Sequence, residues 1–261
     1  MNLSLGGKHA IVCGASQGIG RACALALAEL GACVTVVARN AQALAAVVAS
    51  LSKRDGQAHE LIALDFADPK RVGRAIRARV DSAPAQILVN NTGGPPEGPA
   101  HSATSEEYLA AFTRHLLCNQ ALVQAVLPGM KAAGYGRVIN IISVSVKEPI
   151  PGLGVSNTVR GAVASWAKTL ARELGPDNIT VNNVLPGFTN TSRLHALIAS
   201  KTKRTGVSEE EVMAQMRAQV PLGRFAEPQE TANVVAFLAS PAASYVNGIN
   251  LPVDGGRTLS L

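Results

Sequence analysis

Short apolar runs alternate along the chain with longer stretches in which apolar residues recur three or four positions apart. The short runs are rich in Val, Ile, Leu and Ala, as is typical of strands buried on both faces of a sheet. We expect strands at residues 9–13, 33–38, 60–64, 87–90, 137–142, 180–185 and 250–253. The longer stretches have the spacing of amphipathic helices. We expect helices at residues 20–30, 42–51, 69–80, 106–130 and 156–173.

This alternation of strands and helices indicates repeated β–α–β units. It predicts an α/β fold with a Rossmann-type, doubly wound parallel sheet of about seven strands and helices on both faces. No Ser/Pro linker, internal repeat or charge block divides residues 1–261, which we expect to form one domain. Such sheets bind ligands beyond the carboxyl ends of their strands, so the loops that follow the strands are where chemistry is expected.

The composition supports this fold and argues against a nucleic-acid partner. Of the 261 residues, 47% are hydrophobic and 16% charged, which allows a large buried core. Only 3% are aromatic, too few for an aromatic nucleic-acid platform. The net charge is +6, but the basic residues are scattered. The densest groups are Lys70, Arg71, Arg74, Arg77 and Arg79, and then Lys201, Lys203 and Arg204. A solvated helix face explains the first group.

The cysteines and the N-terminal residues indicate the cellular compartment in which we expect the protein. Cys13, Cys23, Cys33 and Cys118 have no metal-ligand spacing, and three of them lie in apolar runs. We interpret them as small core residues in a reducing compartment and expect no metal site. Residues 1–8 lack the apolar stretch of a signal peptide, and no segment reaches transmembrane length. The sequence thus predicts a soluble, cytoplasmic protein without a membrane partner.

A glycine-rich turn follows the first expected strand. It reads Cys13-Gly14-Ala15-Ser16-Gln17-Gly18-Ile19-Gly20 and opens directly into an expected helix. Glycines let the backbone turn sharply and approach a pyrophosphate, which sits on the free N–H groups at the start of the helix. The alternative is a glycine-rich turn with no ligand. We favour a dinucleotide site formed by Gly14, Ser16, Gln17, Gly18, Ile19 and Gly20.

The end of the second expected strand bears on the choice of dinucleotide. NAD enzymes usually place an acidic side chain there to bind the ribose hydroxyls, whereas an arginine accommodates the 2′-phosphate of NADP. This chain has Arg39 followed by Asn40, and no acid. We therefore expect NADP(H) more than NAD(H), and an ordinary exposed arginine is the alternative.

Further motifs follow the later strands. They are Leu64-Asp65-Phe66, Asn90-Asn91-Thr92-Gly93, Asn182-Asn183-Val184-Leu185-Pro186-Gly187 and Val253-Asp254-Gly255-Gly256. With the glycine turn, they make residues 6–256 resemble the short-chain dehydrogenase/reductase family. The resemblance implies an NADP(H)-dependent oxidoreductase acting on a carbonyl or a secondary alcohol. It also implies cofactor contacts from Asp65, Phe66, Asn91, Gly93, Arg160, Pro186, Gly187, Thr189 and Thr191.

The catalytic positions of that family are matched only in part. Its members typically use an Asn-Ser-Tyr-Lys tetrad, with the last two in a Tyr-x-x-x-Lys helix. Ser143, at the end of the fifth expected strand, resembles the catalytic serine. The positions of the Tyr and the Lys fall on Ser156 and Arg160, and that of the Asn falls on His115. The resemblance therefore implies a divergent member with Ser143, Ser156, Arg160 and His115 as the catalytic candidates.

No other side chain is an obvious replacement for the missing phenol. Tyr108 begins a long expected helix, Tyr135 precedes the fifth strand at its amino end, and Tyr245 leads into the last strand. Arg160 cannot exchange a proton in the working pH range, but it can hold ribose hydroxyls and stabilise an alkoxide. His115, with an unperturbed pKa of about 6.5, can donate a proton if it reaches the substrate. A packed or hydrogen-bonded helix residue is the alternative.

Three functions stay open on the sequence alone. The first is an NADP-dependent oxidoreductase with rearranged acid–base groups. The second is a dinucleotide-binding protein with little or no redox activity, serving as a sensor or an inactive subunit. The third is a non-redox enzyme that uses the same pocket. The family resemblance favours the first, whereas the loss of Tyr and Lys favours the other two.

Two further regions are assigned by the resemblance. Residues 189–220, with expected helices at 194–199 and 208–218, are similar to the family's mobile substrate lid. Within them, the basic residues 201–204 are either a solvated turn or a site for an acidic substrate or an acyl-carrier phosphate. The expected helices at 106–130 and 156–173 resemble the pair that forms the family's tetramer contact. We therefore expect a homotetramer that acts on a small-molecule substrate.

Overall fold

The computed structural model describes residues 1–54 and 56–260. In this part of the chain, seven strands form one parallel sheet in the order β3-β2-β1-β4-β5-β6-β7. The strands are β1 (His9–Cys13), β2 (Cys33–Ala38), β3 (Glu60–Ala63), β4 (Ile87–Asn90), β5 (Gly136–Ile141), β6 (Ile179–Pro186) and β7 (Asn250–Val253). The strand order reverses between β1 and β4, at the switch point where doubly wound sheets bind ligands. The predicted Rossmann-type fold is confirmed.

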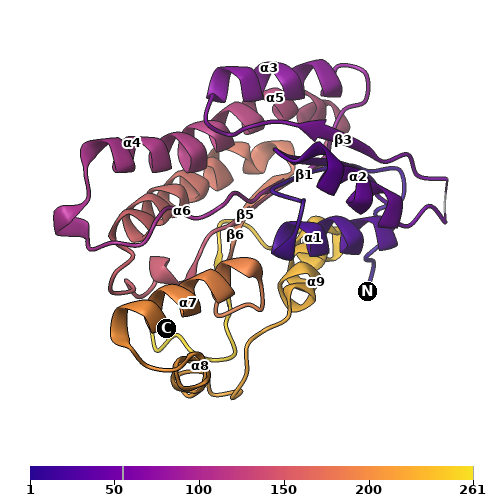
Figure 1. Ribbon diagram of the computed structural model, residues 1–261. Coiled ribbons are helices and arrows are strands. Elements are labelled where there is room, and N and C mark those ends of the chain that lie inside the picture. The colour runs from indigo at the N-terminus through magenta and orange to yellow at the C-terminus, as the bar shows by residue number, and fades with distance from the viewer. Residues whose placement is uncertain (55, 261) are drawn as a thin grey trace.

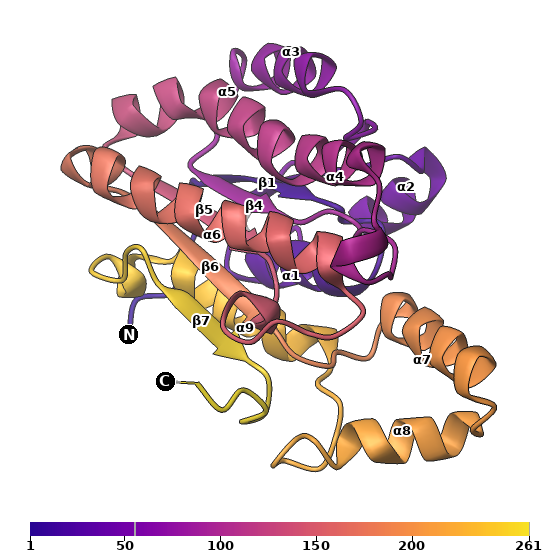
Figure 2. The ribbon, with the colours of Figure 1, turned by 90° about the vertical axis from the view of Figure 1, so that its left-hand side faces the viewer.

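Helices cover both faces of the sheet (Figures 1 and 2). One face carries α1 (Gly18–Glu29), α2 (Ala41–Ser50) and α9 (Pro228–Ala239), and the other carries α3 (Pro69–Val80), α5 (Cys118–Ala133) and α6 (Gly154–Leu174). Successive residues of a strand point to opposite faces. Ile11 of β1 therefore packs in the core with α3 and α5, whereas Val12 packs in the core with α1 and α9. The sheet thus separates two apolar cores.

Local capping explains where several helices begin. The Asp68 side chain accepts a hydrogen bond from the Arg71 backbone N–H, and Pro69 occupies the first turn of α3, which begins as expected. Helix α9 was not among the expected helices. It begins at Pro228 behind a capping box formed by Glu227 and Glu230.

The prediction of one continuous α-helix at residues 106–130 is wrong in one respect. Helix α4 (Ser105–Phe112) continues into η2 (Thr113–Leu117), a π-helical turn, and then into α5. A π turn holds more residues than an α turn and is frequent at functional sites. It contains His115, which is buried. Hydrophobic spacing did not show the interruption because the π turn lies between two α-helical segments and is itself helical.

The segment after β6 forms a separate layer. Helices α7 (Ser192–Thr205) and α8 (Glu209–Arg217) lie to one side of the sheet, near the carboxyl ends of the strands (Figures 1 and 2). They share a small apolar cluster of their own, formed by Leu194, Ile198, Val212 and Met216. Both expected helices are present, and the first is longer than expected.

A row of four asparagine side chains crosses the second half of the sheet. Asn90 of β4 donates to Asn140 of β5 over 2.8 Å. Asn140 donates in turn to Asn183 of β6 over 2.9 Å, and Asn183 donates to Asn250 of β7 over 2.8 Å. These residues are also register partners in the strand pairing. We call this row the amide ladder.

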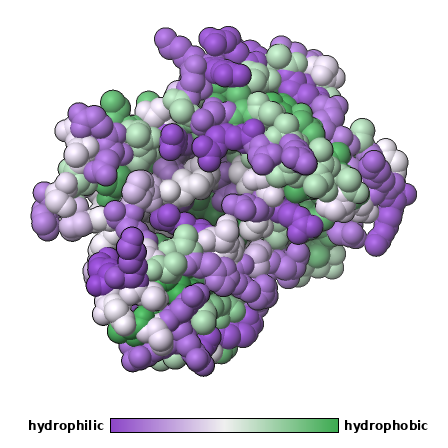
Figure 3. All heavy atoms as spheres, in the orientation of Figure 1, coloured by the Kyte–Doolittle hydropathy of each residue, from purple (hydrophilic) through white to green (hydrophobic). Residues whose placement is uncertain are grey.

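The distribution of hydrophilic residues on the surface is consistent with apolar cores that lie between the sheet and its helices. In Figure 3, hydrophilic residues dominate the outline of the molecule, and hydrophobic residues show mainly between the helices. Among the described residues, no helix combines the length and the apolar character needed to cross a membrane.

The amide ladder generates a prediction about stability. Asn140→Leu removes the middle amide and leaves the buried Asn90 and Asn183 side chains without that partner. Each orphaned buried polar group costs about 1–3 kcal/mol, so we expect a loss of about 2–5 kcal/mol in the free energy of unfolding. Urea unfolding followed by circular dichroism measures it. The control is Ile139→Val, a neighbour on the other face of β5, which should cost only about 0.5–1.5 kcal/mol. Equal losses in both variants would contradict a special role for the ladder.

Candidate functional site

The glycine turn is built so tightly that it excludes side chains. Gly14 and Gly18 have positive φ angles of 60° and 55°. A Cβ atom on Gly14 would collide with the Asn91 carbonyl oxygen, and one on Gly20 would collide with the Gly14 carbonyl oxygen. The Asn91 side chain also donates to the carbonyl oxygens of Cys13 and Gly14, each over 3.3 Å. The end of β4 therefore holds the turn after β1 in place.

The start of α1 leaves backbone donors available. Gln17 is the N-cap residue, and its side chain makes no capping hydrogen bond. The N–H groups of the first helical turn have no partner within the helix, so they can bind an anion. Ser16 and Ile19 are half-buried in the turn, and Gln17 is exposed. These residues fit a dinucleotide pyrophosphate, as expected from the sequence.

The residues expected at the adenosine end lie after neighbouring strands. Arg39 follows β2, is exposed, and forms no ion pair with any residue the structure describes. Asp65 follows β3, and its carboxylate accepts from the Ala67 N–H over 3.1 Å. The Phe66 side chain is buried in the core, so only its backbone can face a ligand.

The residues expected at the nicotinamide end follow β6. A Cβ atom on Gly187 would lie 2.7 Å from Asp254, so a side chain there is excluded. Thr189 is buried and donates to the Gly187 carbonyl oxygen over 3.3 Å. Thr191 caps α7, and its methyl group lies 3.2 Å from a Cβ placed on Gly18. Pro186 is the last residue of β6, and the segment that follows it faces the glycine turn through Thr191.

The catalytic candidates Ser143 and Ser156 come from β5 and α6. Ser143 precedes the short helix η3 (Val144–Val146), and its Oγ accepts the Ser145 N–H over 3.1 Å. Its own hydroxyl hydrogen is then free to be donated, for example to a carbonyl oxygen. Ser156 is buried in the first turn of α6.

Arg160 lies one turn further along α6. It is 9% exposed, and its Nη1 donates to the Ile141 carbonyl oxygen over 2.9 Å, beside Ser143. Burial, and then the nearby Arg193 cation, lower the pKa of Arg160 to about 10. Arg160 therefore remains a cation at neutral pH and can stabilise negative charge without exchanging protons.

His115 lies in the same region, but it is neutral. Its Nδ1 is 2.8 Å from the Thr92 Oγ1, and Gly93 forms a backbone hydrogen bond to the ring. Burial above all, followed by the cations Arg160 and Arg114, lowers the pKa of His115 to about 3. The imidazole lacks the near-neutral titration on which its expected role as proton donor depended. The alternative of a packed, hydrogen-bonded residue describes it.

None of the three tyrosines of the chain replaces the catalytic tyrosine of the family, whose position falls on Ser156. The Tyr135 hydroxyl donates to the Ala239 carbonyl oxygen over 2.7 Å, at the amino end of β5 as expected. Tyr245 is fully exposed, and Tyr108 packs against Val155 and Val159.

Other side chains at the site were not foreseen from the sequence. Arg193, in the first turn of α7, donates from Nη2 to the Pro95 carbonyl oxygen over 2.8 Å. Thr92 was quoted only as part of a motif, yet it binds His115. Both contacts join segments far apart in the sequence, so no local pattern announced them.

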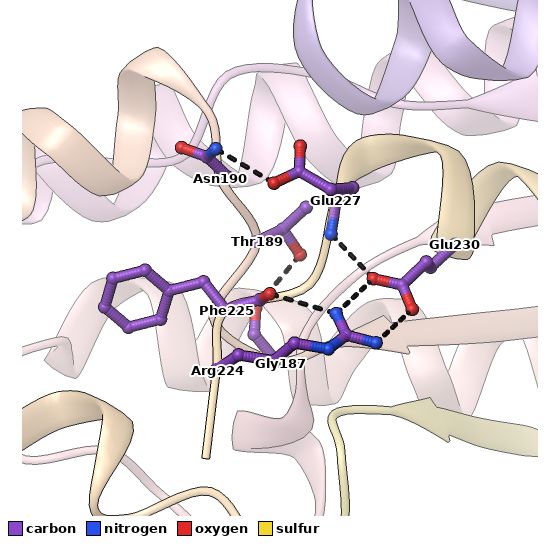
Figure 4. Close-up of polar contacts among 7 residues, drawn as sticks. All are labelled: Gly187, Thr189, Asn190, Arg224, Phe225, Glu227 and Glu230. Atoms are coloured by element: carbon purple, nitrogen blue, oxygen red, sulfur yellow. Dashed lines mark hydrogen bonds and ion pairs between the residues drawn. The ribbon is translucent and has the colours of Figure 1, made fainter. Parts of the chain in front are cut away.

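The two ends of the segment 190–226 are also joined, as Figure 4 shows. Asn190 and Ala226 are linked by a backbone hydrogen bond of 2.7 Å, and the Asn190 side chain donates to Glu227 over 3.0 Å. Arg224 forms a two-pronged ion pair with Glu230, with both distances 2.7 Å. Residues 190–226 therefore leave and re-enter the body of the protein at one fixed base.

Comparisons with known proteins agree with this site. The profile of a family described as enoyl-(acyl carrier protein) reductase matches residues 14–258. The NADPH-dependent reductase BacG of Bacillus subtilis is 29% identical over 256 residues, which are 97% of this chain and 99% of the relative. The 3-oxoacyl-[acyl-carrier-protein] reductase FabG of Pseudomonas aeruginosa is 34% identical over 259 residues, which are 99% of this chain and 100% of the relative.

Solved structures show the same likeness along the whole chain. The crystal structure of L-sorbose reductase from Gluconobacter frateurii, in complex with NADPH and L-sorbose, superposes with a TM-score of 0.93 at 32% identity and covers 100% of both chains. That of YwfH, an NADPH-dependent reductase involved in bacilysin biosynthesis, superposes with a TM-score of 0.91 at 30% identity, covering 97% of this chain and 99% of the other. With its sheet order, its glycine turn and these relatives, the chain belongs to the short-chain dehydrogenase/reductase family.

Proposed function

We propose that the protein is an NADP(H)-dependent oxidoreductase that acts on a carbonyl or a secondary alcohol of a small molecule. The observation that carries the proposal is the glycine turn after β1, which has no room for side chains and lies at the same carboxyl edge of the sheet as Ser143, with β4 between their strands. The relatives named above support it, because two of them are NADPH-dependent reductases and a third was crystallised with NADPH.

The exposed Arg39 supports the choice of NADP(H). It stands at the end of β2, next to the glycine turn on β1, and the structure shows no acidic partner for it among the described residues. A guanidinium binds phosphate through paired, charge-assisted hydrogen bonds, whereas the ribose hydroxyls of NAD(H) offer it no charge.

In the proposed mechanism, Ser143 and Arg160 polarise the substrate carbonyl, and no side chain of the site acts as the proton donor. When bound, the nicotinamide supplies or accepts the hydride. Ser143 donates its hydroxyl hydrogen to the substrate oxygen, and the cation of Arg160 stabilises the negative charge that develops there. The neutral His115 positions Thr92 and Gly93. We propose that water held by the hydroxyl groups of Ser143 and Ser156 supplies the proton.

The site therefore departs from the family's usual tetrad. We assign Ser156 and Arg160 to the positions of the family's Tyr and Lys, and His115 to that of its Asn. A positioned general acid typically contributes about 10²–10⁴ in rate, so slow turnover is expected. If this loss is complete, the protein binds the dinucleotide without redox activity, or uses the pocket for a non-redox reaction.

We propose that residues 189–220 form a lid over the substrate. The apolar cluster of α7 and α8 is separate from the two sheet cores, so this layer can move as one unit. Its fixed base at Asn190 and Ala226 provides the hinge. The basic residues 201–204 at the end of α7 are half-buried or exposed, as in a solvated turn.

We also propose a homotetramer built through α4, α5 and α6. Leu109, Phe112 and Leu117 are 65%, 37% and 42% exposed, which is unusual for apolar side chains of this size on a helix pair. On α6, the position of a Cβ on Gly161 meets open space, so another helix can approach closely.

We place the protein in the cytoplasm. All four cysteines are free thiols, and burial raises the pKa of Cys23 and of Cys118 to about 12. Buried neutral thiols of this kind suit a reducing compartment.

Cofactor choice is tested with Arg39→Ala. Loss of a charge-assisted contact of about 1.5–3 kcal/mol should weaken NADPH binding by about 10- to 100-fold and leave NADH binding nearly unchanged. Dissociation constants come from titrating the fluorescence of each nucleotide. Arg74→Ala, an exposed arginine of α3 on the opposite face, is the control and should change neither value. Equal affinities for the two nucleotides in the wild type would remove the claim.

Catalysis is tested by NADPH oxidation with a panel of ketones, keto acids and aldehydes. Removal of one donor to the developing oxyanion typically costs about 10²–10³ in kcat, and we expect that loss for Ser143→Ala. Ser145→Ala is the control, since only its backbone N–H contacts Ser143. If NADPH binds at micromolar concentration but no member of the panel oxidises it, the protein is a binding protein or a non-redox enzyme.

Assembly is tested by light scattering coupled to size exclusion. The wild type should have four times the chain's mass of 27.0 kDa at micromolar concentration. Leu109→Asp should lower the mass, because it places a charge on the proposed contact. Leu222→Asp, at an equally exposed leucine outside that contact, should leave the tetramer intact. A monomeric wild type contradicts the assignment.

A further inference from the structure

Two arginine residues at the catalytic end of the site interact electrostatically. Arg160 reaches it from α6 and is bonded to the Ile141 carbonyl oxygen, at the end of the strand that leads to Ser143. Arg193 reaches it from the first turn of α7 and is bonded to the Pro95 carbonyl oxygen. The Arg193 guanidinium also lies 3.6 Å from a Cβ placed on Gly94. The pair therefore joins the lid helix, the loop after β4 and the end of β5.

No carboxylate balances this pair in the part of the chain that the structure describes. The ion pairs found there engage Arg54, Arg79, Lys131 and Arg224, and neither arginine of the site. Burial lowers the pKa of Arg160 most, and the positive charge of Arg193 lowers it further. His115, the other titratable group beside Arg160, is neutral.

The acidic side chains of the two nearest loops are engaged elsewhere. Glu97, in the loop after β4, accepts from the Ser200 hydroxyl of α7 over 3.4 Å. Glu148, in the loop after η3, accepts from the backbone N–H groups of Leu259 and Ser260 over 2.6 and 2.7 Å. A buried cation next to a second cation is unfavourable unless an anion joins them. An anionic ligand would provide the missing countercharge.

We propose that Arg193 binds a carboxylate of the substrate while Arg160 keeps its proposed place at the reacting oxygen and adds its positive charge to the attraction, so that the protein acts on keto acids or hydroxy acids and discriminates against neutral ketones and alcohols. This inference rests on the proposed oxidoreductase function. A guanidinium pairs with a carboxylate through two parallel hydrogen bonds, and two guanidinium groups approaching from different elements fix the direction of the substrate. Fixing that direction places the reacting carbon relative to the hydroxyl of Ser143.

The cofactor pyrophosphate is the competing ligand for these arginines. It already has a site at the glycine turn and the uncapped start of α1, on β1. Arg160 belongs instead to α6 and β5, on the side of Ser143. The substrate carboxylate is therefore the ligand that the arrangement favours, and the experiment below separates the two.

The basic residues 201–204 do not form this site. They lie in the last turns of α7, whereas Arg193 lies in its first turn. Lys203 is exposed and takes part in no ion pair among the described residues, so it provides a matched control of the same charge on the same helix.

The kinetic test compares each keto acid with its own methyl ester, with NADPH as the reductant. The probes are acetoacetate, levulinate and phenylpyruvate and their esters. We expect the wild type to prefer at least one acid by about tenfold or more in kcat/KM, the factor that 1.4 kcal/mol provides. Arg193→Gln should abolish the preference mainly through a higher KM for the acid, and Arg193→Lys should restore part of it. Lys203→Gln should keep it.

The binding test needs no turnover. Malonate and its uncharged analogue malonamide are added to the protein loaded with NADP⁺, and thermal unfolding is followed. Malonate alone should raise the Tm of the wild type and of Lys203→Gln, and should have no effect on Arg193→Gln. Arg193 is exposed, so this variant is expected to fold. If all ketones and keto acids fail as substrates while malonate binds through Arg193, the oxidoreductase function fails and the anion site stands.

Two outcomes overturn the inference. One is a malonate effect that is absent in the wild type or unchanged in Arg193→Gln. The other is a large loss of NADPH affinity in Arg193→Gln with an unchanged ratio of acid to ester, which would assign the arginine to the cofactor pyrophosphate.

Discussion

The amide ladder fixes the positions on which the site depends. Each inner asparagine donates one hydrogen bond and accepts another inside a buried sheet, where an unpaired amide is costly. A slip of one residue in any of the strands β4 to β6 would break the row and turn every side chain of that strand to the other face. The ladder therefore sets the strands in a single register. Asn91 follows Asn90 directly, Ser143 comes three residues after Asn140, and Gly187 comes four residues after Asn183. By fixing the register of β4, β5 and β6, the amide ladder also fixes where the loops after these three strands begin relative to one another.

Electrostatically, the site is arranged to receive negative charge. Arg160 and Arg193 are cations without an ion-pair partner among the described residues, and burial, followed by the cations Arg160 and Arg114, keeps His115 neutral. Protonating this histidine would add a third positive charge to a poorly hydrated space, which explains why its pKa is so low. The site thus stabilises anions at the expense of proton transfer. This balance is consistent with a hydride-transferring enzyme in which orientation and charge stabilisation carry most of the rate.

The sequence predicted the fold well because the relevant signals are local. Buried parallel strands are continuous apolar runs, and the glycine turn must consist of glycine where backbone meets backbone, as at Gly14 and Gly20. The remaining features depend on contacts between distant segments. The π turn around His115 lies within a continuous helical stretch, so no turn residue marks it in the sequence. The neutrality of His115 arises from burial and from charges that include Arg160, 45 positions later in the chain. Arg193 stands alone in the sequence, and only the fold brings it to Pro95, which lies 98 positions earlier.

The hydrogen-bonded base of the segment 190–226 has a consequence for how such a protein changes over evolutionary time. Residues 190 and 226 are held together by their own hydrogen bonds, and α7 and α8 have their own apolar cluster. Insertions, deletions or replacements within residues 194–217 leave the strands, the hydrogen bonds of this base and the contact of Thr191 with the glycine turn in place. New substrate preferences can therefore arise by exchanging one cassette, while the machinery for the dinucleotide is inherited unchanged.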